Sequence, residues 1–207
     1  MAIFRRAANP ALAACARQAS TAAPSLLRLN EVVDGVRFRT PTLEDARTMF
    51  EIVTSGSLDD NSAYAYMVFS THFASTCIVA EEPESGAPLG FVMGYCPPTD
   101  PEAFFCWQVG VTEAARGRGV ARRMMESLCK GLADTSGVKY LEATVTPDNE
   151  ASRRLFAGFG RRAGCPVKVT EDHFPQAMFP PGHDAEGLFR VGPFEASDIG
   201  AHDSGRA

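Results

Sequence analysis

The sequence contains no apolar run that approaches the roughly 20 residues needed by a membrane-spanning helix. Its six cysteines are scattered, with no Cys-x-x-Cys pair among them, and we find no secretory signal. These absences exclude a transmembrane protein and argue against a disulfide framework. We therefore expect reduced thiols in a cytoplasmic protein.

The sequence supports neither a metalloprotein nor a nucleic-acid-binding protein. A metal site needs closely spaced Cys and His ligands, and only His173 and His183 lie near Cys165, in a loop-like region. The formal net charge of −5 does not favour nucleic acid, which attracts basic proteins. We expect no metal and no nucleic-acid or membrane partner, so the partners should be small molecules or other proteins.

The two ends of this 207-residue chain differ in composition from its middle, which is long enough for one domain. Residues 1–35 are rich in alanine and have no acid before Glu31, a composition that also fits an organellar transit peptide. Residues 194–207 are polar and show no periodic apolar spacing. We expect a poorly ordered extension at 1–35, a folded domain at 36–193 and a flexible tail at 194–207.

Hydrophobic periodicity in the middle of the chain predicts alternating strands and helices. Apolar residues spaced as on one helix face indicate helices at 43–53, 62–73, 120–132 and 149–158. Runs rich in β-branched and aromatic residues indicate strands at 36–39, 76–80, 89–95, 104–111 and 140–145. The resulting order, β-α-α-β-β-β-α-β-α, predicts a mixed α/β layer fold.

The most informative segment lies between an expected strand and an expected helix and reads Arg116-Gly117-Arg118-Gly119-Val120-Ala121. Its glycines let successive backbone N–H groups point into one concavity, where the helix N-terminus adds partial positive charge. Arg122 and Arg123 follow directly. The spacing matches neither a P-loop, which needs Gly-Lys-Ser/Thr, nor a dinucleotide fingerprint, which needs Gly or Ala at position 122. The segment predicts a phosphate site, with an exposed basic helix start as the alternative.

Three motifs that follow one another in the sequence carry a family resemblance. They are Gln108-Val109-Gly110-Val111, Arg116-x-x-Gly119-x-Ala121 and Asn149-x-x-Ser152-x-x-x-Phe156-x-x-Phe159-Gly160. Together they resemble the GNAT superfamily of acetyl-CoA-dependent N-acetyltransferases, over roughly residues 36–193. The resemblance implies a central, mostly antiparallel sheet flanked by helices, with acetyl-CoA as co-substrate.

In that superfamily the arginine- and glycine-containing loop holds the pyrophosphate of coenzyme A, and the preceding strand binds the pantetheine arm through main-chain groups. Carried over to this sequence, the coenzyme-binding positions are Val109, Val111, Arg116, Gly117, Arg118, Gly119, Val120, Ala121 and Asn149. A main-chain N–H near Val109 would stabilise the negative charge that builds on the thioester oxygen. Phe156 stands where many members have a tyrosine that protonates the leaving thiolate, so this chain lacks that acid.

Four further segments narrow the resemblance. They are 58–66 (LDDNSAYAY), 105–109 (FCWQV), 144–149 (TVTPDN) and 183–186 (HDAE). Together they resemble the diaminobutyrate acetyltransferases of ectoine biosynthesis, which are generally homodimers. This resemblance implies transfer of acetyl to the γ-amine of L-2,4-diaminobutyrate, and it places substrate-binding positions at Asp59, Tyr64, Trp107, His183 and Glu186.

The substrate chemistry is compatible with those positions. Diaminobutyrate carries two ammonium groups, which call for acids and an aromatic wall, and the reacting amine must lose a proton before it attacks. We take Glu186 as the catalytic base and Asp59 as the anchor of an ammonium group; the reverse assignment exchanges these catalytic roles. Each residue also has an ordinary structural explanation: an acid as a helix cap, Trp107 and Tyr64 as core residues, and His183 as a surface residue.

Other functions stay open at the level of sequence. A GNAT domain also acetylates protein termini, lysines, aminoglycosides or polyamines, and a coenzyme A sensor would keep the phosphate loop without turnover. Cys106, beside Trp107, suggests an acyl-cysteine route, but no histidine base lies near it in the sequence. The two acids at the acceptor positions favour an enzyme over a sensor.

Overall fold

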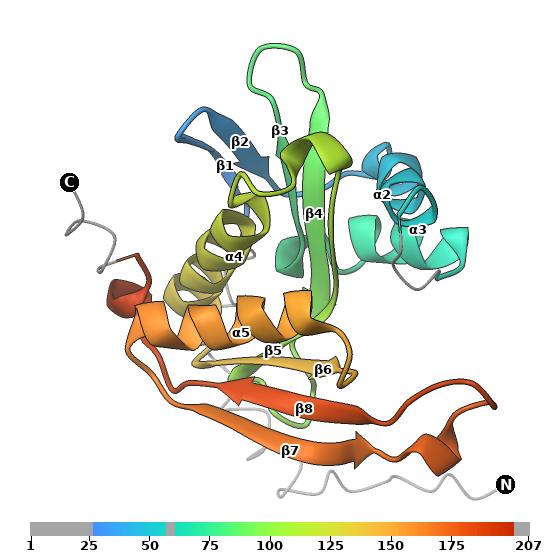
Figure 1. The fold of residues 1–207 in the computed structure, drawn as a ribbon. Coiled ribbons are helices and arrows are strands. Elements are labelled where there is room, and N and C mark those ends of the chain that lie inside the picture. The colour runs from blue at the N-terminus through green and yellow to red at the C-terminus, as the bar shows by residue number, and fades with distance from the viewer. Residues whose placement is uncertain (1–26, 57–60, 201–207) are drawn as a thin grey trace, which may run out of the picture.

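The computed structural model describes residues 27–56 and 61–200. The expectations for residues 1–26, for Asp59 and for residues 201–207 therefore lie outside the described residues. In the described part, eight strands form one sheet, and four α-helices pack against it (Figure 1). The mixed α/β class expected from the sequence is confirmed.

The sheet is mostly antiparallel. Its strands, in chain order, are β1 (Asn30–Val33), β2 (Val36–Arg39), β3 (Ile78–Glu81), β4 (Pro88–Tyr95), β5 (Ala103–Val111), β6 (Tyr140–Val145), β7 (Val167–Phe174) and β8 (Glu186–Val191). Across the sheet the order is β1-β2-β3-β4-β5-β6-β8-β7. Each neighbouring pair of described strands is antiparallel except β5–β6, which is parallel.

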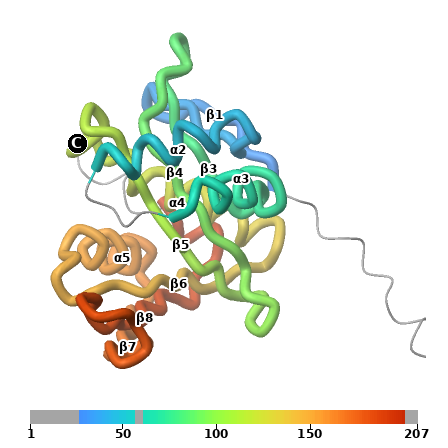
Figure 2. The backbone as a smooth tube through the Cα atoms, turned by 90° about the vertical axis from the view of Figure 1, so that its right-hand side faces the viewer, coloured from blue at the N-terminus to red at the C-terminus, as the bar shows by residue number. Residues whose placement is uncertain are grey.

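The helices cover both faces of the sheet. They are α2 (Asp45–Thr54), α3 (Ala63–Thr71), α4 (Val120–Ser136) and α5 (Glu150–Ala163). Helices α2 and α3 lie on one face and α4 on the other face of the same strands, as Figure 2 shows. Helix α5 shares the hydrophobic core of α4 and packs on β8. A second, smaller core lies beneath α2 and α3, where Tyr66 and Phe91 are buried.

A β-bulge at Trp107 changes which side of β5 faces each core. Met93 of β4 pairs with Gln108 and Gly94 pairs with Cys106, so Trp107 is an extra residue in β5. Gly94 permits this close approach, because a Cβ there would lie 2.3 Å from the carbonyl oxygen of Phe105. A bulge shifts the alternation of side chains by one residue and bends the strand.

Strands β5 and β6 separate immediately before this bulge. Their pairing covers only Ala103, Phe104 and Phe105 of β5, opposite 140–142 of β6. Beyond that point β5 stays paired with β4 as far as Val111, whereas β6 stays paired with β8 as far as Val145. The sheet therefore opens between its two halves.

Local signals set the two ends of α5. Asn149 caps α5 as expected, since its Oδ1 accepts a hydrogen bond from the Ser152 backbone N–H at 3.0 Å. The expected stop at Gly158 to Gly160 is wrong, because α5 continues to Ala163 and ends at Gly164, which has a left-handed backbone. Gly160 serves packing instead: a Cβ there would lie 2.3 Å from Cγ2 of Val167.

The described fold extends beyond the expected limits of 36 and 193. At the N-terminal side, β1 pairs with β2, and Leu27 is only 7% exposed because it packs against Gly131 of α4. At the C-terminal side, the rings of Phe194 and Phe159 lie 5.4 Å apart, and Phe194 is 1% exposed. Residues 27–35 and 194–200 are therefore parts of the fold rather than a disordered extension and a flexible tail.

The sequence analysis also missed β1, β7 and β8. The side chains of β1 are all exposed, and β7 alternates between apolar and polar residues only from Val167 to Thr170, so neither strand carries the alternation along its full length. Among the described helices, none is long and apolar enough to cross a membrane.

We predict that Phe194→Ala lowers the free energy of unfolding by about 3 to 5 kcal/mol, because it empties a buried aromatic site. Urea denaturation measures the change. Met178→Ala is the control, since Met178 is 80% exposed and a surface change of this kind stays within about 0.5 kcal/mol. An unchanged free energy of unfolding in a chain shortened to residues 36–193 would contradict the packing described for both ends.

Candidate functional site

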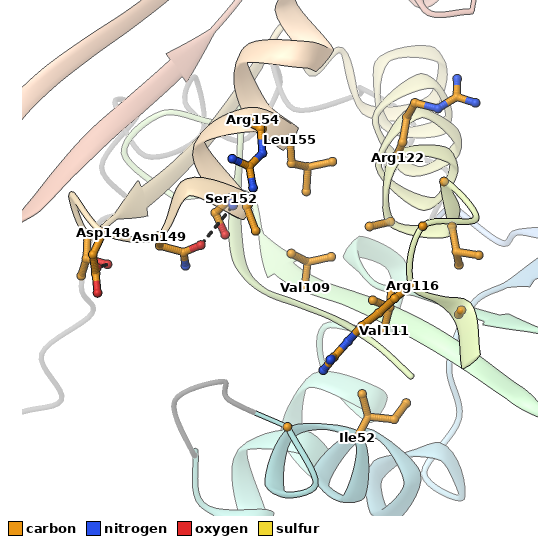
Figure 3. Close-up of a pocket in the computed structure, with 18 of the residues that line it drawn as sticks. Ile52, Val109, Val111, Arg116, Arg122, Asp148, Asn149, Ser152, Arg154 and Leu155 are labelled. Atoms are coloured by element: carbon orange, nitrogen blue, oxygen red, sulfur yellow. Dashed lines mark hydrogen bonds between the residues drawn. The ribbon is translucent and has the colours of Figure 1, made fainter. Parts of the chain in front are cut away.

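The opening between β5 and β6 forms a cleft of about 1080 Å³. Its walls come from the C-terminal half of β5, the segment before α4, the first turns of α4 and α5, the end of α2, and a loop before β8 (Figure 3). The residues that line it are Ile52, Gly56, Val109, Val111, Ala115, Arg116, Gly117, Gly119, Val120, Ala121, Arg122, Thr146, Asp148, Asn149, Ala151, Ser152, Arg154, Leu155, Arg162, Gly182, His183 and Asp184.

Backbone N–H groups line one end of the cleft. Gly117 and Gly119 have φ values of 73° and 72°, a left-handed conformation that glycine adopts without strain. The first bond at the start of α4 runs from the Arg123 N–H to the Gly119 carbonyl, and no side chain caps this end. Val120 and Ala121 therefore keep amide groups without an intrahelical acceptor. An anion at this end gains hydrogen bonds and the favourable helix dipole.

The four arginines of this region do not act together. Arg116 reaches across the cleft towards α2, where its NH2 lies 3.8 Å from the Cβ position of Gly56 (Figure 3). Arg118 instead pairs with Glu82 at 3.1 Å and does not line the cleft. Arg123 donates to the carbonyls of Val33 and Asp34 in the β1–β2 turn, both at 3.3 Å. Of the nine expected coenzyme-binding residues, Arg118 is thus the one that the structure leaves outside the cleft.

The exposed edge of β5 forms a second wall. From Cys106 to Val111 this strand has no partner on its β6 side, and Val109 and Val111 both line the cleft. Asn149, at the start of α5, lies on the opposite wall (Figure 3). The main-chain groups of this unpaired strand edge face the cleft between the two walls.

Of the described residues that were expected to bind the acceptor, not all line the cleft. His183 lines the cleft and stacks on Phe179, with ring centroids 6.0 Å apart. Glu186 is half-buried at the start of β8, opposite Phe174, but it does not line the cleft. Tyr64 points outward from α3 and is 72% exposed. Asp59 lies outside the described residues.

Trp107 belongs to a polar cluster that sequence reasoning missed. Its Nε1 donates to Oδ1 of Asn61 at 3.3 Å, while the Asn61 amide and the Tyr66 hydroxyl donate to Oε1 of Gln108 at 3.3 and 3.0 Å. Because of the bulge, Trp107 and Gln108 both face α3. Asn61 and Gln108 stand inside the segments that carry the resemblance, but neutral amides give no charge signal from which a role could be predicted.

Phe156 supplies no acid for the reaction, and Cys106 supplies no thiolate nucleophile. Phe156 is buried against Phe189 and has no proton to donate. Burial raises the pKa of the Cys106 thiol to about 12, with a smaller contribution from Cys77, so Cys106 is not a thiolate near neutral pH. The five described cysteines are all free thiols.

In the part of the chain that the structure describes, no three His, Cys, Asp or Glu side chains converge as a metal site would need.

Comparison with known proteins agrees with this geometry. Residues 43–160 match the acetyltransferase (GNAT) family. The chain is 41% identical over 166 residues to an L-2,4-diaminobutyric acid acetyltransferase of Marinococcus halophilus, covering 80% of this chain and 94% of that protein. It is 43% identical over 164 residues to the protein of that name from Chromohalobacter salexigens, covering 78% and 83% of the two chains.

A solved structure is similar over the same region. It is the diaminobutyrate acetyltransferase of Paenibacillus lautus in complex with L-2,4-diaminobutyric acid and coenzyme A, which is 37% identical with a TM-score of 0.69. The match covers 80% of this chain and 96% of that one. A family match over more than half of the chain, relatives above 40% identity and a shared fold lead to one conclusion: the chain belongs to the acetyltransferase (GNAT) family.

Proposed function

We propose that this protein transfers the acetyl group of acetyl-CoA to the γ-amine of L-2,4-diaminobutyrate, giving N4-acetyl-L-2,4-diaminobutyrate, a step of ectoine biosynthesis. The observation that carries the proposal is the similarity to a structure that holds both L-2,4-diaminobutyric acid and coenzyme A, at 37% identity over 80% of this chain. The cleft with an amide-lined end supports it, because coenzyme A needs a site for its pyrophosphate.

The donor is held by two kinds of group. The amides of Val120 and Ala121 and the guanidinium of Arg116 bind the pyrophosphate, and the edge of β5 near Val109 and Val111 binds the pantetheine arm. Attack on the thioester builds negative charge on its oxygen, and a fixed main-chain N–H of β5 stabilises that charge. Since such a donor is already oriented, it costs little reorganisation during the reaction.

The acceptor enters from the side of Trp107 and α3. Asp59 anchors one ammonium group and Glu186 takes the proton from the other, while Tyr64, Trp107 and His183 position the carbon chain. The reacting ammonium gives up one proton before attack and a second as the amide forms. The leaving thiolate takes up one of these, so each turnover releases one proton to solvent.

The proposal includes the cellular location and the oligomeric state of the enzyme. We place it in the cytoplasm, where thiols stay reduced, in keeping with its five free described cysteines. We also propose a homodimer, as the family resemblance implies. The exposed ring of Phe174, at the end of β7, is available for such a contact.

The first prediction from the proposed function distinguishes the role of Arg116 from that of Arg118. Arg116→Gln should raise the KM for acetyl-CoA by about 10-fold to 100-fold, because a charged hydrogen bond contributes roughly 1.5 to 3 kcal/mol. Arg118→Gln is the matched control, and it should leave this KM nearly unchanged since it loses only a half-exposed pair with Glu82. Steady-state kinetics with thiol detection measures both. Equal effects of the two variants would contradict the assignment.

The second prediction concerns proton transfer and the choice between the two amines. Glu186→Gln should lower kcat at pH 7 by about 100-fold or more, as expected for loss of a general base. The loss should shrink near pH 10, where an alkylamine with a pKa of about 10.4 is largely neutral. Asp59→Asn should chiefly raise the KM for diaminobutyrate and allow some Nα-acetyl product, identified by NMR.

Glu84→Gln, in the exposed turn between β3 and β4, is the control for removal of one carboxylate. If Asp59→Asn loses kcat while Glu186→Gln keeps it, the two acids exchange roles. If diaminobutyrate gives no more thiol release than spermidine, an aminoglycoside and a lysine peptide, the proposed substrate is wrong.

The third prediction concerns Cys106. Cys106→Ala should keep kcat within about twofold, because a thiol with a pKa of about 12 supplies almost no thiolate at neutral pH. The same change should lower stability, since it empties buried space. Detection of an acetylated protein by mass spectrometry in the absence of amine, together with loss of kcat in Cys106→Ala, would establish the acyl-cysteine route instead.

A further inference from the structure

One of the four described arginines that line the cleft lies at the junction of α4 and α5, away from the phosphate loop. Arg162, near the end of α5, lines the cleft, and its Nε donates to Oε1 of Glu126 on α4 at 2.5 Å. NH1 of Arg122 lies 3.4 Å from the other oxygen of the same carboxylate. The Glu126 side chain is 16% exposed, so this carboxylate is held between two arginines at the junction of α4 and α5.

The contact with Glu126 orients Arg162 for a further ligand. It uses Nε, and within residues 27–56 and 61–200 no acceptor bonds the two terminal nitrogens of Arg162. A guanidinium held in this way presents its terminal N–H groups as a pair, which suits the bidentate geometry of a phosphate.

Gly158, one turn earlier in α5, provides the room for this side chain. A Cβ at position 158 would lie 3.0 Å from NH1 of Arg162, closer than an ordinary contact. Glycine inside a helix costs about 1 kcal/mol relative to alanine. The absence of a side chain at Gly158 leaves room for the guanidinium of Arg162 over this turn of α5.

The contact between Glu126 and Arg162 lies farther along α4 than the phosphate loop. Glu126 comes six residues after Val120, which starts the helix, so it lies about 9 Å farther along the axis at 1.5 Å per residue. The cleft therefore offers two anion-binding points on one side. Coenzyme A carries two separate anionic groups, the pyrophosphate and the monophosphate on the ribose 3′-oxygen.

We infer that Arg162 binds the ribose 3′-phosphate of the coenzyme, and that Glu126 is a positioning residue for Arg162. The inference rests on the proposed use of acetyl-CoA. It makes Arg162 a specificity-determining residue, which favours coenzyme A over acyl donors that end in a pyrophosphate or a phosphopantetheine without the 3′-phosphate.

Isothermal titration with coenzyme A and with 3′-dephospho-coenzyme A, without any amine, tests this inference. The intact enzyme should bind coenzyme A about tenfold or more tightly than the dephospho form, the factor expected from one charged hydrogen-bonded pair. Arg162→Gln should remove this difference by weakening coenzyme A alone. Arg162→Lys should keep part of it, because the charge remains while the fork is lost.

Arg161→Gln is the matched control, since it removes the same charge one residue away, at an exposed position outside the cleft. Glu126→Ala should reduce the ratio of the two dissociation constants and leave the affinity for the dephospho form unchanged. A merely structural role of Glu126 would weaken both ligands together.

Three results would overturn the inference. They are equal affinity of the intact enzyme for the two ligands, equal weakening of both ligands in Arg162→Gln, or an unchanged ratio in both Arg162 variants. In each of these cases thiol release from acetyl-CoA with diaminobutyrate, measured on the intact enzyme, decides separately whether the proposed function stands. If the intact enzyme bound neither ligand, the proposed function would fail and this inference would fail with it.

Discussion

The separation of β5 from β6 is the constraint on which the site depends. Two strands that paired along their full length would leave no cleft, and the backbone edge of β5 would be used in the sheet. Pairing stops after Phe105, and the bulge at Trp107 follows at once. The bulge turns Val109 and Val111 into the cleft and turns Trp107 and Gln108 towards α3. A single irregularity in one strand thus directs neighbouring side chains of β5 to opposite faces of the sheet.

The electrostatic potential in the cleft depends on nearby groups rather than on the net charge of the chain. The chain has a formal net charge of −5, which by itself repels a polyanion such as coenzyme A. Screening limits the reach of distant charges to about 8–10 Å at physiological salt, so the groups within the cleft decide. There Arg116, Arg162 and the amides at the start of α4 line the cleft. Arg118 and Arg123, although close in sequence, have their guanidinium groups on Glu82 and on the β1–β2 turn instead.

Burial determines which reactive groups take part. Cys106 is adjacent to Trp107 in sequence, yet its thiol faces the core under α4 and its pKa rises to about 12. The neighbouring Trp107 and Gln108 face the opposite side, where Asn61 and Tyr66 satisfy their polar atoms with neutral hydrogen bonds. A neutral network holds these side chains in place without adding charge on this side of the strand.

Much of the fold and the site could be predicted from the sequence because the signals are local. Glycines before an apolar periodic run predict the left-handed loop and the start of α4, and Asn149 predicts the cap of α5. Other features depend on segments far apart in the chain. Gly160 looks like a helix stop, but it is a packing position against Val167 of β7. Exposed strands carry little alternation, so β1 gives no signal and β7 gives one only over its first four residues.

The sequence by itself determined the α/β class, the glycine-containing turn before α4 and the family, since each rests on patterns that are complete within single segments of the chain. Only the tertiary structure decided the bulge at Trp107, the outward direction of Arg118, the meeting of Glu126 with Arg162, and the packing of Leu27 and Phe194 into the core. The physical reason is that backbone conformation and helix caps depend on neighbours in sequence. The direction of a long side chain and the burial of a terminal segment depend instead on which distant surface has room and a partner for them.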